Sequence, residues 1–290
     1  MMKDSYKRIL VVQDISCVGQ CSLTVALPIL SACGFETAIL PSAVLSTHTG
    51  GSFSGYTFRD LTDDIPAILA HWQKQSITFD ALYTGYLGST RQVEMVETIM
   101  DTLIIPGGVK IVDPAMADNG QLYAGFDENY VAAMRRLCAR ADIILPNITE
   151  AAMLTGLPYS EEQSEDYITE LLTGLAGISS AAVVLTGVGF EPDIIGAMSV
   201  KGGNAHYYGR HRIPRMFHGT GDVYASAFTG AYLRGHSLHS AAAVAVDFTL
   251  AAIENTVDAP EHWYGVRFEP MLPKLIERLN ALNSTEFNGK

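Results

Sequence analysis

Cysteine is scarce in this sequence, and its few residues are not arranged as metal ligands. The four cysteines are Cys17, Cys21, Cys33 and Cys138. Cys17 and Cys21 lie four residues apart, but no second Cys or His pair follows at the spacing of a zinc site. We therefore expect reduced thiols, no zinc site and a cytoplasmic protein.

Basic residues are also few. The chain has 19 lysines and arginines against 31 acidic residues, which gives a net charge of −12 at pH 7. Nucleic-acid binding needs clustered Lys and Arg, so we expect no nucleic-acid partner. No run of 18 apolar residues is present, and the N-terminal apolar run is too short for a signal peptide. We therefore expect no membrane partner, although an acidic chain can still hold a local anion site.

Three familiar motifs are missing as well. The P-loop pattern Gly-x-x-x-x-Gly-Lys-Ser/Thr does not occur, which counts against a P-loop kinase. No Gly-x-Gly-x-x-Gly follows the first expected strand, which counts against a nicotinamide dehydrogenase. The Gly-x-Ser-x-Gly elbow of a serine hydrolase is absent too.

What the sequence does have is a regular alternation of strands and helices in a chain that is 48% hydrophobic. This alternation predicts an α/β fold: a three-layer α/β/α arrangement with a mostly parallel central sheet, in one domain over residues 1–290. Strands are expected over residues 7–13, 37–45, 81–84, 109–112, 142–145 and 182–186, with a hairpin over 193–200 and 205–212. Helices are expected over residues 21–33, 61–74, 90–103, 127–139, 149–155, 161–176, 222–234, 238–254 and 268–282. Residues 46–58 are expected to form a loop.

The most informative stretch is His218-Gly219-Thr220-Gly221-Asp222. It places two glycines and a carboxylate where a helix is expected to begin. Free N–H groups at a helix start carry partial positive charge, and glycines let an anion approach them closely. Asp222 beside these donors can accept a proton from an attacking hydroxyl. An anion hole with an adjacent base is what phosphoryl transfer to an alcohol requires.

Polar residues follow six of the expected strands, and the carboxyl ends of parallel strands meet at one edge of a sheet. Each of these residues also has a purely structural explanation. Asp14 and Asp113 could cap turns or helices, and Thr49, Thr186 and Gly187 could form local turns. His48 could be a solvated loop residue, and Tyr86 could pack in the core. Asn147 and Glu150 fit a capping box at a helix start. The candidate residues at strand ends are Asp14, His48, Thr49, Tyr86, Asp113, Asn147, Glu150, Thr186 and Gly187.

These segments together resemble the pyridoxal kinase branch of the ribokinase-like family over nearly the whole chain. The Gly-x-Gly-Asp motif at Gly219–Asp222 is typical of the wider family. Gly85-Tyr86-Leu87-Gly88-Ser89 and His48-Thr49 are narrower and resemble vitamin B6 kinases. The resemblance implies ATP-dependent phosphorylation of the 5′-hydroxyl of pyridoxal, pyridoxine or pyridoxamine, in a homodimer.

The resemblance also implies a role for each candidate residue. Asp222 would be the base, and the N–H groups of Gly219, Thr220 and Gly221 would hold the developing charge. Asp14, His48, Thr49 and Tyr86 would surround the pyridine ring. Asp113 and Glu150 would organise Mg²⁺. The ATP-binding residues would be Asn147, Thr186 and Gly187. Some family members also use K⁺.

Two departures from the family pattern matter. Many relatives have serine where this chain has Asp14, and an acid there favours a donor-rich ligand such as pyridoxamine. Many also have a lysine soon after the sixth strand, where this chain has Leu185-Thr186-Gly187-Val188-Gly189. Positive charge would then come from Mg²⁺, K⁺ or the arginines of residues 210–215, which are alternatively a charged strand edge.

Two other functions stay open on the sequence alone. The first is a related kinase for hydroxymethylpyrimidine or another small alcohol. The second is a non-catalytic ligand-binding relative, which would be expected to lack Asp222 or Glu150; this chain has both.

Overall fold

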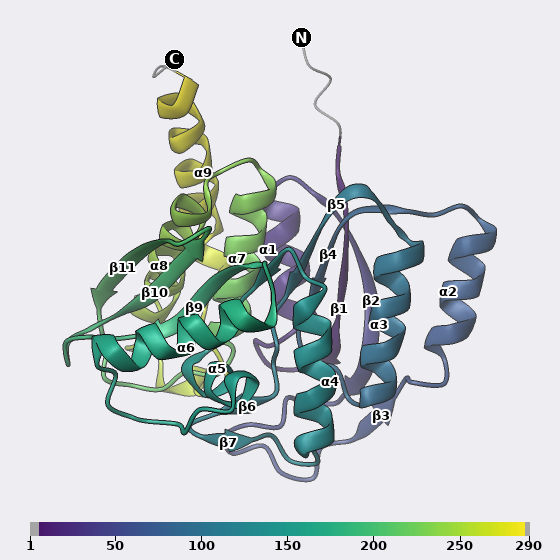
Figure 1. Cartoon of the computed structure of the whole chain (residues 1–290), viewed down its shortest axis with the longest axis horizontal. Helices are drawn as coiled ribbons and strands as arrows, with labels where there is room; N and C mark the ends of the chain where they lie inside the picture. The colour runs from purple at the N-terminus through teal and green to yellow at the C-terminus, as the bar shows by residue number, and fades with distance from the viewer. Residues whose placement is uncertain (1–5, 288–290) are drawn as a thin grey trace.

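The computed structural model describes the backbone of residues 6–287 and the side chains of residues 6–281. In that range nine strands form one sheet in the order β11-β10-β9-β8-β5-β4-β1-β2-β3 (Figure 1). The six strands from β9 to β2 pair in parallel, while β10 and β11 at one end and β3 at the other are antiparallel. The strands are β1 Arg8–Ser16, β2 Glu36–Leu45, β3 Phe58–Asp60, β4 Phe79–Thr84, β5 Ile104–Val112, β8 Ile143–Ile144, β9 Ala182–Val188, β10 Ile194–Lys201 and β11 Asn204–His211.

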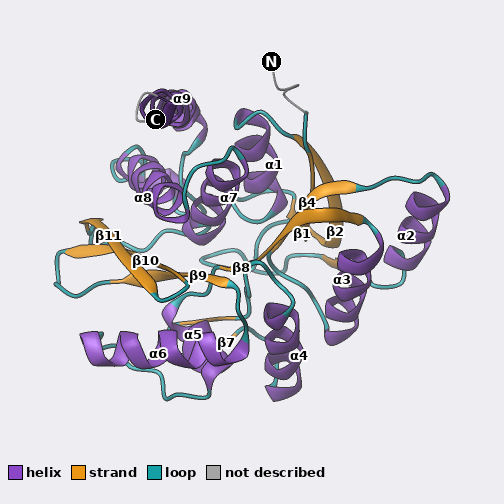
Figure 2. Ribbon diagram, turned by 45° about the horizontal axis from the view of Figure 1, so that its top comes forward, coloured by secondary structure: helices purple, strands orange, loops and turns teal. Residues whose placement is uncertain are grey.

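Helices cover both faces of this sheet, so the predicted three-layer arrangement is confirmed (Figure 2). β1 shows why: Ile9 and Val11 enter one hydrophobic cluster, whereas Leu10 and Val12 enter the other. One face carries α1 Leu23–Ala32, α7 Thr220–Leu233, α8 Leu238–Glu254 and α9 Leu272–Phe287, and the other carries α2 Ile65–Lys74, α3 Thr90–Thr102, α4 Glu128–Ala139, α5 Ile148–Thr155 and α6 Glu165–Ile178. Within residues 6–287, no helix is both long and apolar enough to cross a bilayer.

Short elements differ from the sequence expectation. The strand β3 begins at the last residue of the expected 46–58 loop. All three of its residues are exposed, so it lacks the alternation that marks a half-buried strand. A second sheet pairs β6 Ala117–Asp118 with β7 Gln121–Leu122, and two short 3₁₀ turns lie at Pro260–His262 and Glu269–Met271. These elements are too short for periodicity to predict.

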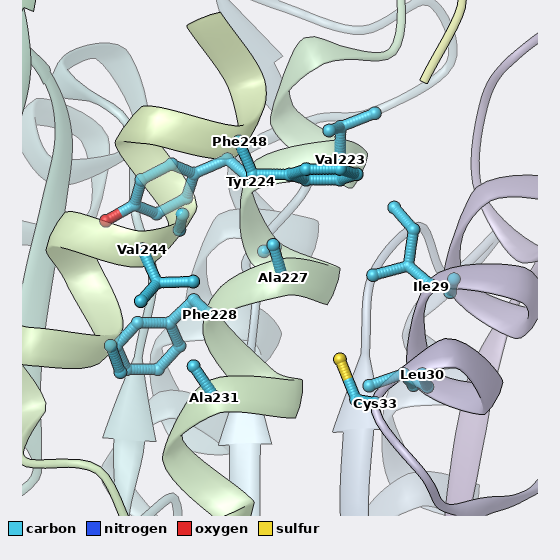
Figure 3. Packing of buried hydrophobic residues seen from close by; sticks show 14 of the residues in the cluster. Ile29, Leu30, Cys33, Val223, Tyr224, Ala227, Phe228, Ala231, Val244 and Phe248 are labelled. Carbon is cyan, nitrogen blue, oxygen red and sulfur yellow. The ribbon is translucent and has the colours of Figure 1, made fainter. Parts of the chain in front are cut away.

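Helix α7 is the most enclosed element near the predicted anion hole. Ten of its fourteen residues are buried, and it lies between α1 and α8 (Figure 3). A Cβ on Gly230 would lie 2.3 Å from Cys33 Sγ, so α1 and α7 approach closely because this position has no side chain. Phe228, which is fully buried, lies beside Val244 of α8. Packing on both sides thus fixes where the first turn of α7 points.

Replacing Phe228 with alanine should reduce the free energy of unfolding by about 3–5 kcal/mol, because it removes a fully buried ring and leaves a cavity. Urea titration followed by circular dichroism measures this loss. Ile276→Ala, at an exposed position of α9, should change stability by less than about 0.5 kcal/mol. Equal losses in the two variants would show that α7 packing does not fix this region.

Candidate active site

The predicted site residues collect at one edge of the sheet. Asp14 lies near the end of β1, Asp113 directly follows β5, and Asn147 follows β8. Thr186 and Gly187 are in the last residues of β9. The strands β1, β5, β8 and β9 run parallel within the sheet, so their carboxyl ends share one edge. The topology therefore brings these groups together as the sequence predicted.

The Gly-Thr-Gly-Asp stretch forms the first turn of α7, which begins two residues earlier than expected. Gly219 is the N-cap, Thr220 is the first helical residue, and Asp222 is the third. Gly219 has a φ of 74°, and a Cβ there would lie 1.6 Å from the carbonyl oxygen of Gln20. Glycine is required at this position for structural reasons alone.

Gly221 is different. A Cβ there would meet no heavy atom within 4 Å, and the residue is exposed. Glycine costs about 1 kcal/mol relative to alanine in a helix interior, so this position gains nothing in stability from it. The free space beside the N–H groups of the first turn suits an anionic ligand that must approach the backbone closely.

Asp222 has the electrostatics of a base. Burial raises its pKa from 3.8 to about 7, the nearby Asp14 carboxylate raises it as well, and the backbone N–H of Ser22 lowers it. A base is most effective when its pKa lies near the working pH. Asp222 can therefore exchange a proton near neutrality.

Asp14 is held by two serine hydroxyls. Ser22 Oγ donates to one carboxylate oxygen at 2.5 Å, and Ser16 Oγ donates to the other at 3.2 Å. Burial nevertheless raises the pKa of Asp14. The register of β1 against β2 shifts between Gln13 and Ile15, so the ladder is irregular at Asp14. Such irregularities redirect a side chain, here towards Ser22 at the start of α1.

Asn147 and Glu150 form the capping box that was their structural alternative. The backbone N–H of Asn147 donates to Glu150 Oε2 at 2.8 Å, and the N–H of Glu150 donates to Asn147 Oδ1 at 2.9 Å. Glu150 Oε1 also accepts from the backbone N–H of Met116 at 3.2 Å. Because Glu150 is 2% exposed, burial raises its pKa despite these bonds. Burial also raises the pKa of Asp113, as do the Glu150 and Asp222 carboxylates.

This edge is acidic without a compensating cation among the described residues. No lysine, arginine or histidine there lowers the pKa of Asp14, Asp113, Glu150 or Asp222. Two of the arginines of residues 210–215, which were expected to supply positive charge, bond to other groups. Arg210 Nε contacts Asp247 Oδ1 of α8 at 2.8 Å, and Arg215 donates to the carbonyl of Val257 at 2.8 Å.

Thr186 and Gly187 lie beside the capping box. Thr186 forms a parallel bridge with Asn147, and its N–H donates to the carbonyl of Pro146 at 2.9 Å. Gly187 has a φ of 76°, and its carbonyl accepts from Gln163 Nε2 at 3.1 Å. A Cβ on Gly187 would meet nothing within 4 Å, so its glycine reflects backbone conformation rather than packing.

His48 is buried rather than solvated. Its Nε2 donates to the carbonyl of Tyr264 at 2.7 Å, and its Nδ1 accepts from the N–H of Gly50 at 3.0 Å. Burial and the nearby His218 lower its pKa, so the neutral ring fits both bonds. With both nitrogens occupied, only the ring of His48 is available to a ligand. The bond to Tyr264 ties the 46–58 loop to a distant segment, and the His48 ring lies 5.1 Å from the ring of His218, which precedes Gly219.

Thr49 and Tyr86 differ in exposure. Thr49 is exposed and, within the described part of the chain, makes no hydrogen bond to Asp14. Tyr86 is partly buried, and its ring stacks on Phe126 at a centroid distance of 5.5 Å. Burial raises the pKa of Tyr86 to about 12, and the charge of Asp14 contributes to that shift. The charge of Asp14 therefore reaches the Tyr86 ring, and the role of both residues around a substrate ring stays a prediction.

Two residues of this region, Ser22 and Tyr123, were not predicted from the sequence. Ser22 Oγ donates a hydrogen bond to Asp14. Burial raises the pKa of Tyr123, and the Glu150, Asp113 and Asp222 carboxylates raise it too. The β6–β7 hairpin brings Tyr123 to this edge. Its Asn119-Gly120 turn, with φ values of 50° and 75°, was the available signal because Asn-Gly favours hairpins.

Comparison with known proteins places this geometry in a family. A family model described as phosphomethylpyrimidine kinase matches residues 62–266, and the chain belongs to that family. The chain is therefore a kinase, and the predicted ribokinase-like kinase fold is confirmed. A kinase of this kind binds a nucleotide.

Three relatives show the breadth of the family. The crystal structure of pyridoxal kinase from Lactobacillus plantarum is 36% identical, with a TM-score of 0.87 over 97% of this chain and 99% of that chain. A Bacteroides thetaiotaomicron protein with a provisional phosphomethylpyrimidine kinase name, crystallised in an orthorhombic form with pyridoxal, is 36% identical, with a TM-score of 0.86 over 95% and 96% of the two chains. The Bacillus subtilis hydroxymethylpyrimidine/phosphomethylpyrimidine kinase is 27% identical over 229 residues, which covers 76% of this chain and 78% of that protein.

The roles of the two glycines of the predicted anion hole can be separated experimentally. Gly221→Ala should leave the melting temperature unchanged or raise it, because its Cβ meets open space, yet lower kcat at least tenfold by crowding the N–H groups. Gly219→Ala should lower the melting temperature, because its Cβ collides with Gln20. Thermal unfolding and ADP release measure the two effects. Normal turnover in Gly221→Ala would contradict the anion-hole assignment.

Proposed function

We propose that this kinase transfers the γ-phosphoryl group of ATP to the 5′-hydroxyl of pyridoxal, pyridoxine or pyridoxamine, with Asp222 as the base. The observation that carries the proposal is Asp222 in the first turn of α7, with burial raising its pKa to about 7. The substrate class rests on the two 36%-identical structures, one of a pyridoxal kinase and one of a crystal form with pyridoxal.

The chemical step needs a base and a place for negative charge. Asp222 takes the proton of the 5′-hydroxyl while that oxygen attacks the γ-phosphorus. The bond between the γ-phosphorus and its bridging oxygen breaks, and ADP leaves with that oxygen. The N–H groups of Gly219, Thr220 and Gly221 hold the charge that develops on the transferred group.

Mg²⁺ suits the acidic edge of the site. Described residues hold no cluster of three or more His, Cys, Asp or Glu side chains suited to a metal ion. Mg²⁺ typically uses one or two carboxylates, several waters and the substrate phosphates, so it fits a two-carboxylate site. Asp113 would hold it directly, and Glu150, whose oxygens already accept backbone N–H bonds, would act through water. When bound, Mg²⁺ or K⁺ would supply the positive charge that neutralises the phosphates.

The remaining predicted residues divide into two groups. Asp14, Tyr86 and the ring of His48 surround the pyridine ring, with Thr49 on the adjoining loop. Asn147, Thr186 and Gly187 line the nucleotide side, where the Asn147–Thr186 bridge joins β9 to the start of α5. We also retain a homodimer and a cytoplasmic location as parts of the proposal.

The second candidate function is phosphorylation of hydroxymethylpyrimidine. It is favoured by the family model and by the Bacillus subtilis relative. Both substrates are small heteroaromatic rings with a hydroxymethyl arm, so the same base and anion hole would serve either.

A direct assay separates the two substrates. The protein is incubated with Mg-ATP and each of pyridoxal, pyridoxine, pyridoxamine and hydroxymethylpyrimidine, and ADP release is measured. We expect a higher kcat/KM for at least one vitamin B6 compound than for hydroxymethylpyrimidine. Turnover of hydroxymethylpyrimidine alone would overturn the vitamin B6 assignment.

Asp222→Asn should reduce kcat by about 10²- to 10⁴-fold because it removes the base, while ATP affinity should be retained.

The same variant should also change the pH dependence of stability. The folded-state pKa is raised, so the stability contributed by protonated Asp222 is present below pH 3.8 and is lost as pH rises to about 7. The variant should therefore melt higher than the wild type at pH 8, with the difference vanishing near pH 4.

Asp258→Asn, at an exposed position, is the matched control for the same charge removal. It should retain kcat and show no comparable stabilisation at pH 8. Normal kcat in Asp222→Asn would exclude Asp222 as the base.

A further inference from the structure

Ser22 lies between the two carboxylates of the proposed reaction. It is the N-cap of α1 and is 7% exposed. Its hydroxyl donates to Asp14 Oδ1 at 2.5 Å, and its backbone N–H lowers the pKa of Asp222. One residue therefore bonds to the group assigned to the substrate ring and acts electrostatically on the group assigned to the attacking hydroxyl.

The backbone of Ser22 is in a conformation that favours glycine. Its φ is 56° and its ψ is −130°, a region that residues with a Cβ rarely adopt. Such strain typically persists where the surrounding structure enforces it for function. Glycine would adopt this backbone more easily but would lose the hydroxyl. An interaction of the serine side chain must therefore compensate for this backbone strain. The 2.5 Å hydrogen bond from its hydroxyl to Asp14 is that interaction.

The helix cap itself does not explain the hydroxyl. At an N-cap, a serine side chain ordinarily accepts a hydrogen bond from the second or third helical N–H. The side chain of Ser22 makes no such capping bond. Its hydroxyl is directed to Asp14 instead, so its purpose lies in the site and not in starting α1.

We propose that Ser22 is a positioning residue that fixes Asp14 relative to Asp222. Its hydroxyl orients the Asp14 carboxylate on the substrate ring, and the close approach of Gly219 to Gln20 brings the first turn of α7, with Asp222, to the segment that ends at Ser22. The ring and the base then keep the geometry needed for attack by one particular hydroxyl. This inference rests on the proposed function, because it assigns Asp14 to the acceptor substrate.

Ser22→Gly tests the inference because it removes the hydroxyl and relieves the backbone at once. We expect an unchanged or higher melting temperature, an unchanged KM for ATP, and a loss of about 10- to 100-fold in kcat/KM for the vitamin B6 substrate, the range for a hydrogen bond to a charged group. Ser22→Ala should show the same kinetic loss with a lower melting temperature. A wild-type kcat/KM in Ser22→Gly would overturn the inference.

Two further variants separate positioning from general disturbance. Ser76 also has a positive φ, of 55°, but it is exposed at the end of α2, so Ser76→Gly should leave kcat/KM unchanged. Adding Asp14→Asn to Ser22→Gly should cause no loss beyond that of Asp14→Asn alone, because Ser22 acts through Asp14. Additive losses would contradict this.

A readout without substrate keeps the inference independent of the proposed function. The Asp14 carboxylate can be titrated by carbon-13 NMR in the wild type and in Ser22→Gly. The Ser22 bond lowers the Asp14 pKa, so its removal should raise that pKa. The titratable groups that interact electrostatically with Asp14 are Asp222, Cys21 and Tyr86. All three are present in both proteins, so they do not account for a difference between the two titrations. An unchanged titration would overturn the Ser22 inference, whereas failure of every vitamin B6 compound in the wild type would overturn the proposed function alone.

Discussion

The contact between Gly219 and Gln20 is the constraint on which the site depends. A Cβ at Gly219 would lie 1.6 Å from the Gln20 carbonyl oxygen, so the first turn of α7 can reach the segment before α1 only because no side chain is there. That close approach brings Asp222 to the backbone N–H of Ser22 and near Asp14. The buried packing of α7 between α1 and α8 then holds the arrangement in place (Figure 3).

A second consequence is electrostatic. Carboxylates from β1, the end of β5, the start of α5 and the start of α7 meet at this edge of the sheet. Those of Asp14 and Glu150 are buried, those of Asp113 and Asp222 are partly exposed, and desolvation raises the pKa of each. Such a site costs stability in the free protein. In the proposed function, Mg²⁺ or K⁺ and the N–H donors of α7 would offset that cost when phosphates bind. This explains how an acidic chain without a lysine after β9 can still suit a phosphate substrate. In the proposed function, the helix start and the metal would together supply the positive charge that the resemblance would otherwise assign to a lysine.

Much of this could be predicted from the sequence because the signals are local. Buried parallel strands appear as β-branched runs, and the alternation with helices fixes the layers and the edge at which Asp14, Asp113 and Asn147 meet. The Gly-x-Gly-Asp motif located the first turn of α7, although the expected helix start was two residues late. The two glycines looked alike in sequence. Only the structure shows that Gly219 is required for packing, whereas Gly221 leaves space.

Other features depend on contacts between distant segments. His48 was expected to be either solvated or bound to substrate, but its partner is the carbonyl of Tyr264, more than 200 residues away. Ser22 lay inside a predicted helix, and nothing local marks its backbone strain or its bond to Asp14. The capping box of Asn147 and Glu150 was anticipated as a structural alternative, and it is present. It does not exclude a metal role for Glu150, because a carboxylate can accept N–H bonds and still orient water.

The central claim is that the protonation of the Asp222 carboxylate changes near neutral pH, because the first turn of α7 removes much of its water and the charge of Asp14 acts on it. Carbon-13 NMR titration of the Asp222 carboxyl carbon tests this most directly, with the resonance assigned by its loss in Asp222→Asn. The account predicts a pKa of about 7 in the protein without ligands. A pKa near the ordinary value of 3.8 would contradict it.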